Sequence, residues 1–251
     1  MADFDPMADI PAGADALTVM ISGGFALAYE AALPAFAAMT GLRVRTLSGA
    51  SQGQGPKTMR HQLKRGAAVD VVILSNEGLH DLAEAGWIAA GSAVALASAP
   101  LAAAVRTGTP PPEIGSVAAL ARSLSAARQV VMPGSTSGLF IRDVVFPRLG
   151  IAGTVRALVV ARGTESAAAL VAGEADIALG PVSELVAIPG ITVVGPLPDA
   201  VQLVQTFSAA LLKRARHVAA GRQLTAFLAS DRTTDAIRST GMTPSGTRPV
   251  P

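Results

Sequence analysis

Five short loops in this chain carry the residue types that hold anions, with glycine, serine and threonine placed directly before a helix-like segment. Each loop follows a short apolar run, so each would stand where a strand ends and a helix begins. The first turn of a helix has unpaired backbone N–H groups and partial positive charge, which favour bound anions. Several such loops in one cleft would hold a small anion with neutral donors. The loops are SGG (22–24), GASQGQG (49–55), SNE (75–77), GSTSG (134–138) and GTES (163–166).

The first two loops supply candidate ligand-binding residues. Ser22 offers a hydroxyl, and Gly23 and Gly24 offer N–H groups to an anion that approaches the backbone closely. Ser51 offers a hydroxyl, and Gln52 offers an amide that can donate to a carboxylate. In the alternative interpretation, Ser22 is an ordinary helix cap and the glycine-rich stretch around Ser51 is a flexible surface connection.

The second half of the chain adds three consecutive hydroxyls and a cation. Ser135, Thr136 and Ser137 precede a predicted helix, and three hydroxyls exceed what one helix cap needs. Arg106 ends the apolar run of residues 102–105, and its guanidinium could pair with a carboxylate through two hydrogen bonds. A structural ion pair or a solvated strand end would explain Arg106 equally well.

Other catalytic and metal-binding chemistry finds little support in the sequence. The chain has no cysteine, and its three histidines are far apart and lack metal-ligand spacing. We therefore expect no metal and no cofactor. Glu77 follows an apolar run and could act as a base, but a glutamate in the first turn of a helix usually serves the helix dipole. The sequence leaves the catalytic residue of an enzyme unknown.

Composition excludes several classes of partner. Only 15% of the 251 residues are charged, the formal net charge is +2, and no block of Lys and Arg occurs, so we expect no nucleic-acid partner. Residues 87–105 are uncharged but rich in alanine, which favours a loop and a buried strand over a membrane span. The first nine residues contain three acids and lack the basic and apolar regions of a signal peptide. We expect a cytoplasmic protein, or a periplasmic one if a leader is missing.

Strand-like and helix-like segments alternate along the chain, which is typical of parallel sheets with helices on both faces. The predicted strands cover residues 17–21, 43–47, 69–74, 129–132, 157–161, 176–179 and 191–194. The predicted helices cover residues 25–39, 56–65, 77–85, 139–149, 166–172, 217–229 and 233–239. We expect an α/β fold in which the five loops lie at the carboxyl ends of strands, where open α/β sheets bind their ligands.

An ordered series of motifs covers most of the chain. The motifs are LTVMISGGF (17–25), TG (40–41), GAS (49–51), GAAVDVVIL (66–74), STSG (135–138), RLGI (148–151), GEADI (173–177) and GITVVGPLP (190–198). This series resembles molybdate-binding-protein-like periplasmic solute receptors, and within that group it is most similar to the branch that includes aconitate isomerase.

The resemblance implies the two-lobed type 2 periplasmic-binding-protein fold, with mixed, mostly parallel sheets flanked by helices. Two crossing strands would join the lobes, and the ligand would lie between them. Lobe 1 would comprise residues 17–98 and 206–251, and lobe 2 residues 99–205. Residues 1–16 would form an N-terminal tail.

Two departures from the molybdate receptors of this group bear on the ligand. Those receptors carry a serine pair after the first strand, where this chain has Ser22 followed by Gly23 and Gly24. They also use a tyrosine late in the second lobe, where this chain has residues 179–183 without one. We therefore expect a small carboxylate ligand. The resemblance implies an isomerase of the aconitate isomerase type, which shifts a proton across an allylic system.

A binding protein without chemistry is the alternative function. It would be the solute-binding protein of an ABC importer for molybdate or another small oxyanion, or a cytoplasmic oxyanion sensor. In each case the partner is a small anion, joined by an ABC transporter permease if the protein is exported. We expect a monomer that does not insert into the membrane.

Overall fold

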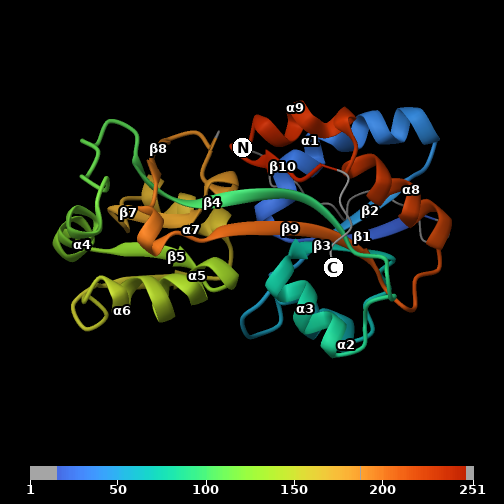
Figure 1. Cartoon of the computed structure of the whole chain (residues 1–251), viewed down its shortest axis with the longest axis horizontal. Helices are drawn as coiled ribbons and strands as arrows, with labels where there is room; N and C mark the ends of the chain where they lie inside the picture. The colour runs from blue at the N-terminus through green and yellow to red at the C-terminus, as the bar shows by residue number, and fades with distance from the viewer. Residues whose placement is uncertain (1–15, 187, 247–251) are drawn as a thin grey trace.

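The computed structural model describes residues 16–186 and 188–246 as an α/β structure with two lobes (Figure 1). Residues 1–15 of the predicted tail lie outside the described residues, as do Ala187 and residues 247–251. No helix in the described ranges is long and apolar enough to cross a membrane. The uncharged stretch of residues 87–105 leads instead into a long strand, β4 (Val94–Arg106), as the sequence predicts.

Ten strands form a mixed sheet in the described chain. They are β1 (Leu17–Ile21), β2 (Val44–Ser48), β3 (Val71–Ser75), β4, β5 (Val130–Pro133), β6 (Ala157–Val160), β7 (Ile177–Pro181), β8 (Ile191–Pro196), β9 (Val204–Leu211) and β10 (Thr243–Pro244). Their order is β2-β1-β3-β9-β4-β7-β5-β6, and β8 and β10 also pair with β4. Each parallel pair of strands lies within a single lobe, two pairs in lobe 1 and two in lobe 2. Every antiparallel pair involves β4 or β9.

Strands β4 and β9 carry the chain between the lobes, and they run side by side across the middle of the molecule (Figure 1). β4 pairs with β9 from Val94 to Pro100, and from Leu101 onward it pairs with β7 and β8. This change of partner marks the passage from one lobe to the other. We retain the lobe boundaries at residues 98/99 and 205/206 as a proposal, since both positions lie within these two strands.

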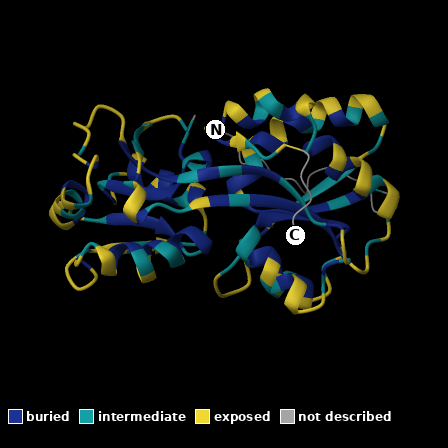
Figure 2. Cartoon of the chain, in the orientation of Figure 1, coloured by how far each residue is buried: buried dark blue, intermediate teal, exposed yellow. Residues whose placement is uncertain are grey.

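Alternating side chains of the lobe 1 strands build a core on each face of the sheet. The lobe 1 helices are α1 (Gly23–Thr40), α2 (Met59–Lys64), α3 (Asn76–Glu84), α8 (Val218–Leu228) and α9 (Thr234–Arg238). In β3, Val71 and Ile73 pack with α1, α8 and α9, whereas Val72 and Leu74 pack with α2 and α3. Successive strand residues point to opposite faces, so a continuous apolar run predicts a strand covered on both sides. Figure 2 shows the buried strands between helices whose outer faces are exposed.

Lobe 2 repeats this layering. Its helices are α4 (Val117–Ala126), α5 (Thr136–Phe140), α6 (Phe146–Arg148) and α7 (Gly163–Val171), and a π-helical segment (Ile141–Val145) joins α5 to α6. Leu101 and Ala103 of β4 pack with α4 and the α5–α6 segment, while Ala102 and Ala104 pack with α7. The Ala-rich run in β4 therefore serves as a strand buried on both faces.

Several predicted boundaries shift by a few residues. The helix predicted from residue 56 begins at Met59, because the Thr58 side chain accepts a hydrogen bond from the His61 N–H (3.3 Å) and caps it there. The helix predicted from Leu139 begins at Thr136, directly after Ser135. Helix α4 was not predicted.

Candidate functional site

A cavity of about 660 Å³ lies between the two lobes. Four of the five predicted loops line it, because β1, β2, β5 and β6 all end at this edge of their sheets. The lining residues are 21–24, 26, 30, 46–51, 62, 135–137, 161–164, 181, 184, 205 and 207. The convergence of these loops makes this cavity the candidate ligand-binding site.

Ser22, Gly23 and Gly24 bring the start of α1 to the cavity. The Ser22 N–H donates to the Ile73 carbonyl (2.8 Å), which holds the loop against β3. The Ser22 hydroxyl makes no capping bond, and its oxygen is buried without a hydrogen-bond partner among the described residues. Leaving a buried hydroxyl without a partner costs free energy, which a hydrogen bond to a ligand would recover.

Ser51 and Thr136 line the cavity and take part in a hydrogen-bond chain that links the lobes. The Ser75 N–H donates to Ser51 Oγ (3.1 Å), and Ser75 Oγ lies 2.9 Å from Thr136 Oγ1. The same Ser75 oxygen accepts from the Gly78 N–H (3.3 Å) at the start of α3. These bonds use part of the hydrogen-bonding capacity of Ser51 and Thr136, so both residues position the loops as well as facing the cavity.

Ser135 and Ser137 stand at the start of α5 and line the cavity. Ser135 occupies the cap position of α5, but its side chain makes no capping bond. Ser137 is 1% exposed. Their hydroxyls and the N–H groups of this helix start are donors of the kind that the sequence predicts for an anion.

Two predicted ligand-binding residues lie away from the cavity. Gln52 donates its side-chain amide to Asp81 Oδ2 (2.6 Å), which directs it towards α3. Arg106 is exposed at the end of β4. Because β4 runs antiparallel to β7, whose last residue Pro181 lines the cavity, the end of β4 points to the opposite edge of lobe 2. The structure therefore does not bring Arg106 or Gln52 into the cavity.

Three charged side chains that the sequence analysis did not select line the cavity, namely Glu30, Arg162 and Glu184. The Arg162 guanidinium, just before α7, donates to Ser48 Oγ (3.0 Å) at the end of β2. Partial burial raises the pKa of the Glu30 carboxyl above its ordinary value. Arg162 is thus a cation at the cavity, whereas Arg106 lies away from it. Among the described residues, no group of three or more His, Cys, Asp or Glu side chains could hold a metal ion.

Glu184 ends a 3₁₀ turn, η2 (Val182–Glu184), which follows β7 directly. The residue as a whole has intermediate exposure, but its Oε2 is buried and no described residue makes a hydrogen bond to that atom. Burial raises the pKa of the Glu184 carboxyl to about 7. Carboxyls with such shifts cluster at functional sites. Glu77, the base considered from the sequence, lies in the first turn of α3 and does not line the cavity.

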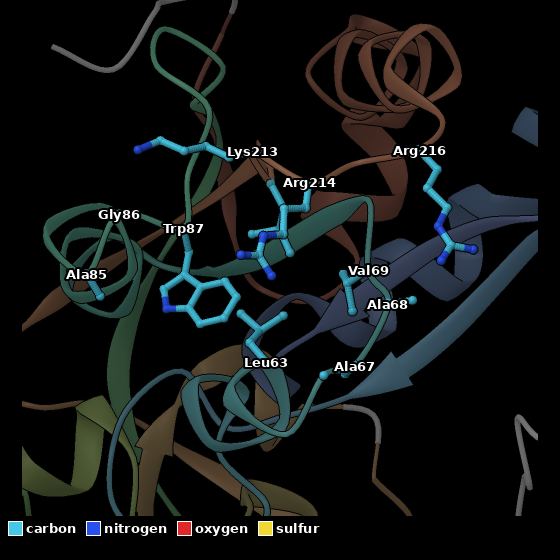
Figure 3. Close-up of a pocket in the computed structure, with 12 residues that line it drawn as sticks. Leu63, Ala67, Ala68, Val69, Ala85, Gly86, Trp87, Lys213, Arg214 and Arg216 are labelled. Atoms are coloured by element: carbon cyan, nitrogen blue, oxygen red, sulfur yellow. The ribbon is translucent and has the colours of Figure 1, made fainter.

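A second cavity, of about 490 Å³, lies at the other edge of lobe 1 (Figure 3). It is lined by residues just before β3, such as Val69, and by residues just after β9, such as Arg214. Figure 3 shows Trp87, Leu63 and Arg214 pointing towards the same space. Ligands of open α/β sheets bind at the carboxyl ends of strands. This cavity lies at the amino end of β3, so the cavity between the lobes is the stronger candidate.

Comparison with known sequences finds a family and a curated relative for this chain. Residues 17–243 match the family described as "Bacterial extracellular solute-binding protein". Aconitate isomerase from a Pseudomonas species is 33% identical over 234 residues, which cover 93% of this chain and 89% of that protein.

Solved structures with low sequence identity share the fold. The sulfate-binding protein of Mycobacterium tuberculosis has a TM-score of 0.72 at 17% identity, covering 92% of this chain and 86% of that one. The periplasmic molybdate-binding protein of Azotobacter vinelandii has a TM-score of 0.67 at 19% identity, covering 90% of this chain and 98% of that one. These likenesses confirm the predicted α/β periplasmic-binding-protein fold.

Proposed function

The chain belongs to the family of bacterial extracellular solute-binding proteins, and on that premise we propose that it binds a small carboxylate anion between its lobes. The cavity offers the hydroxyls of Ser22, Ser135 and Ser137 and the N–H groups at the starts of α1, α5 and α7. It also offers the guanidinium of Arg162, whose planar fork matches a carboxylate. Carboxylate oxygens accept hydrogen bonds from all of these donors.

We propose further that the bound carboxylate undergoes an allylic proton shift, as in aconitate isomerase. The 33% identity to that enzyme over 93% of this chain carries the proposal. In such a shift, a proton leaves one end of a three-carbon unit and a proton is added at the other end, while the double bond moves. The negative charge that develops is delocalised onto an adjoining carboxylate, where N–H donors and Arg162 would stabilise it. Two carboxyls that line the cavity, Glu30 and Glu184, could exchange protons with the substrate.

An assay of the purified protein with trans-aconitate tests the enzymatic proposal. We expect the cis isomer to accumulate until both isomers reach equilibrium. Thermal shifts with tricarboxylates, molybdate, tungstate and sulfate test the ligand class, because a ligand that binds only the folded state raises the melting temperature. Stabilisation by molybdate without any response to tricarboxylates would contradict the carboxylate proposal.

Solute binding without chemistry is the second candidate, and the family match is the observation that favours it. In that case the protein works in the periplasm and delivers its anion to the permease of an ABC importer. We propose the periplasmic location because the family is described as extracellular. Tight binding of a carboxylate with no turnover, together with recovery from the periplasmic fraction of cells, would establish this function over the isomerase.

A further inference from the structure

The Glu184 carboxyl lies where the two lobes meet. It stands between Gly23, at the start of α1, and Gly163, at the start of α7. A Cβ on Gly163 would overlap Glu184 Oε2, and a Cβ on Gly23 would lie 2.6 Å from Oε1. Glycines at both positions therefore leave the space that this carboxyl occupies. The carboxyl thus lies against the same helix starts that would hold an anionic ligand.

The elements packed against Glu184 bring few charges to it. Turn η2 packs against α1 and β4, and Glu184 also meets the start of α7. The cavity-facing charge of α1 is Glu30, while β4 has no charged residue before Arg106 at its far end. Gly241, which lies against Val182, is uncharged, and Arg238, which begins its turn, is exposed.

The start of α7 brings the cation Arg162 and the carboxylate Glu165. Glu165 is paired with Lys57, whose Nζ lies 3.1 Å from Glu165 Oε1, and its other oxygen accepts from the Ala161 N–H (3.0 Å). Glu165 is therefore already neutralised by its partners and does not line the cavity.

The charges that line the cavity oppose an anion as long as both acids are ionised. Glu30 and Glu184 then carry two negative charges against the one positive charge of Arg162. Burial raises the pKa of both carboxyls above their ordinary value, and that of Glu184 to about 7. Glu184 is the acid whose Oε2 is buried without a partner among the described residues, so it gains most from a proton that can form a hydrogen bond.

We propose that Glu184 holds a proton when an anion occupies the cavity and donates it in a hydrogen bond to that anion. The identity of the anion as a carboxylate rests on the function proposed above. At a pH above the pKa of the free Glu184 carboxyl, this group is ionised in the free protein. Binding of the anion then takes up one proton from the buffer at Glu184. Below that pKa the free protein already carries the proton, and no uptake at Glu184 accompanies binding.

The sign of the pH dependence follows from this balance. Burial sets the pKa of Glu184 at about 7 in the free protein, and the bound anion raises it further. Affinity should therefore be highest at about pH 6 and should fall by about tenfold per pH unit above 7, until the pKa of the complex is reached.

Calorimetry with trans-aconitate as the probe, in buffers of different ionisation enthalpy, measures the protons taken up. At about pH 8.5 the parent protein should take up about one proton more per bound anion than Glu184→Gln, and at about pH 6 the difference should vanish. Glutamine imitates the protonated acid as a neutral donor. Glu184→Gln should therefore bind as tightly as the parent at about pH 6 and at least about tenfold more tightly at about pH 8.5.

Two control variants and a second probe complete the experiment. Glu30→Gln removes the other cavity carboxyl, so it should change affinity yet keep the pH dependence, and the exposed Glu174→Gln should change neither. Thermal melts check that each variant folds.

If the parent binds equally well from about pH 6 to 8.5, or if Glu184→Gln keeps the parent's pH dependence, the proposal is overturned. If only molybdate binds, the carboxylate ligand is wrong, and the same comparison with molybdate still tests Glu184. Binding of neither anion would overturn both proposals.

Discussion

Ser22 makes different contributions to folding and to ligand binding. Its buried oxygen has no partner in the described structure, so Ser22→Ala removes no hydrogen bond from the unliganded protein. We expect the free energy of unfolding to stay the same or rise by about 1 kcal/mol. Anion binding should weaken by roughly tenfold or more, because a hydrogen bond to a charged group contributes about 1.5–3 kcal/mol. Chemical denaturation and titration calorimetry measure the two effects.

Ser92 provides the matched control for this substitution. It is also a buried serine, but its hydroxyl donates to the Ala89 carbonyl (2.6 Å) and accepts from the Leu211 N–H (3.1 Å), outside the cavity. Ser92→Ala should lower the free energy of unfolding by about 1 kcal/mol and leave binding unchanged. If Ser22→Ala bound the anion as tightly as the parent, its hydroxyl would not be a ligand.

The two arginines considered for the site should behave differently. Arg162 lines the cavity, so Arg162→Ala should weaken anion binding by at least about tenfold through the loss of a charge-assisted hydrogen bond. Arg106 lies at the far end of β4, so Arg106→Ala should bind like the parent. Binding isotherms at low and high salt measure the anion affinity of both variants. The opposite result would place the ligand at the other edge of lobe 2.

The sequence could predict the neutral donors of the cavity but not its charged groups. Serine and glycine between an apolar run and a helix indicate a strand end, and parallel strands bring such ends to one edge. Arg162 precedes one of these loops, yet an exposed arginine there has the pattern of an ordinary surface residue. Glu184 lies in a single 3₁₀ turn, and its burial depends on Gly23 and Gly163, which are distant in the chain. No local pattern contains that information.

At the scale of elements, Gly24 fixes how closely α1 approaches β9. A Cβ on Gly24 would overlap the ring of Phe207, which is 2% exposed in the lobe 1 core. Gly24→Ala should therefore lower the free energy of unfolding by about 1–3 kcal/mol, the usual cost of overpacking. Urea denaturation measures it. Gly115→Ala is the matched control, because its Cβ would meet nothing within 4 Å, and it should change stability by less than about 0.5 kcal/mol. An unchanged Gly24→Ala protein would mean that the helix shifts without cost.

The strands and helices that alternate in the parallel parts of the sheet could be predicted, because their apolar patterns lie within short segments of the sequence. A continuous apolar run such as the one in β3 can be satisfied only by a strand covered on both faces. Strand β4 contains residues that face two cores in alternation, and its direction through lobe 2 depends on pairing with β7. The position of Arg106 away from the cavity follows from the direction of this strand, which tertiary pairing decides and the local sequence does not.

At the scale of the whole molecule, three polar side-chain contacts in the described part of the chain join the proposed lobes around the cavity, in addition to the packing of η2 against α1. They are Lys57–Glu165 (3.1 Å), Arg162–Ser48 (3.0 Å) and Ser75–Thr136 (2.9 Å). The Lys57 and Glu165 side chains are 52% and 39% exposed, and exposed ion pairs contribute only about 0–1 kcal/mol. These polar contacts add little to the packing of η2 against α1, while β4 and β9 connect the lobes covalently.

A bound anion should therefore decide how far the lobes close. It would accept hydrogen bonds from Ser22 in lobe 1 and from Ser135 and Arg162 in lobe 2, and it would add to the weak contacts between the lobes. A ligand that interacts better with the closed form shifts the population towards it. Small-angle scattering should give a smaller radius of gyration with saturating trans-aconitate than without it, at the mass of one chain in both states. Lys57→Ala, which loses one contact, should keep this ligand-dependent decrease. A radius that stays the same on binding would mean that the lobes are fixed, and the ligand would then have to enter a cavity that is already closed.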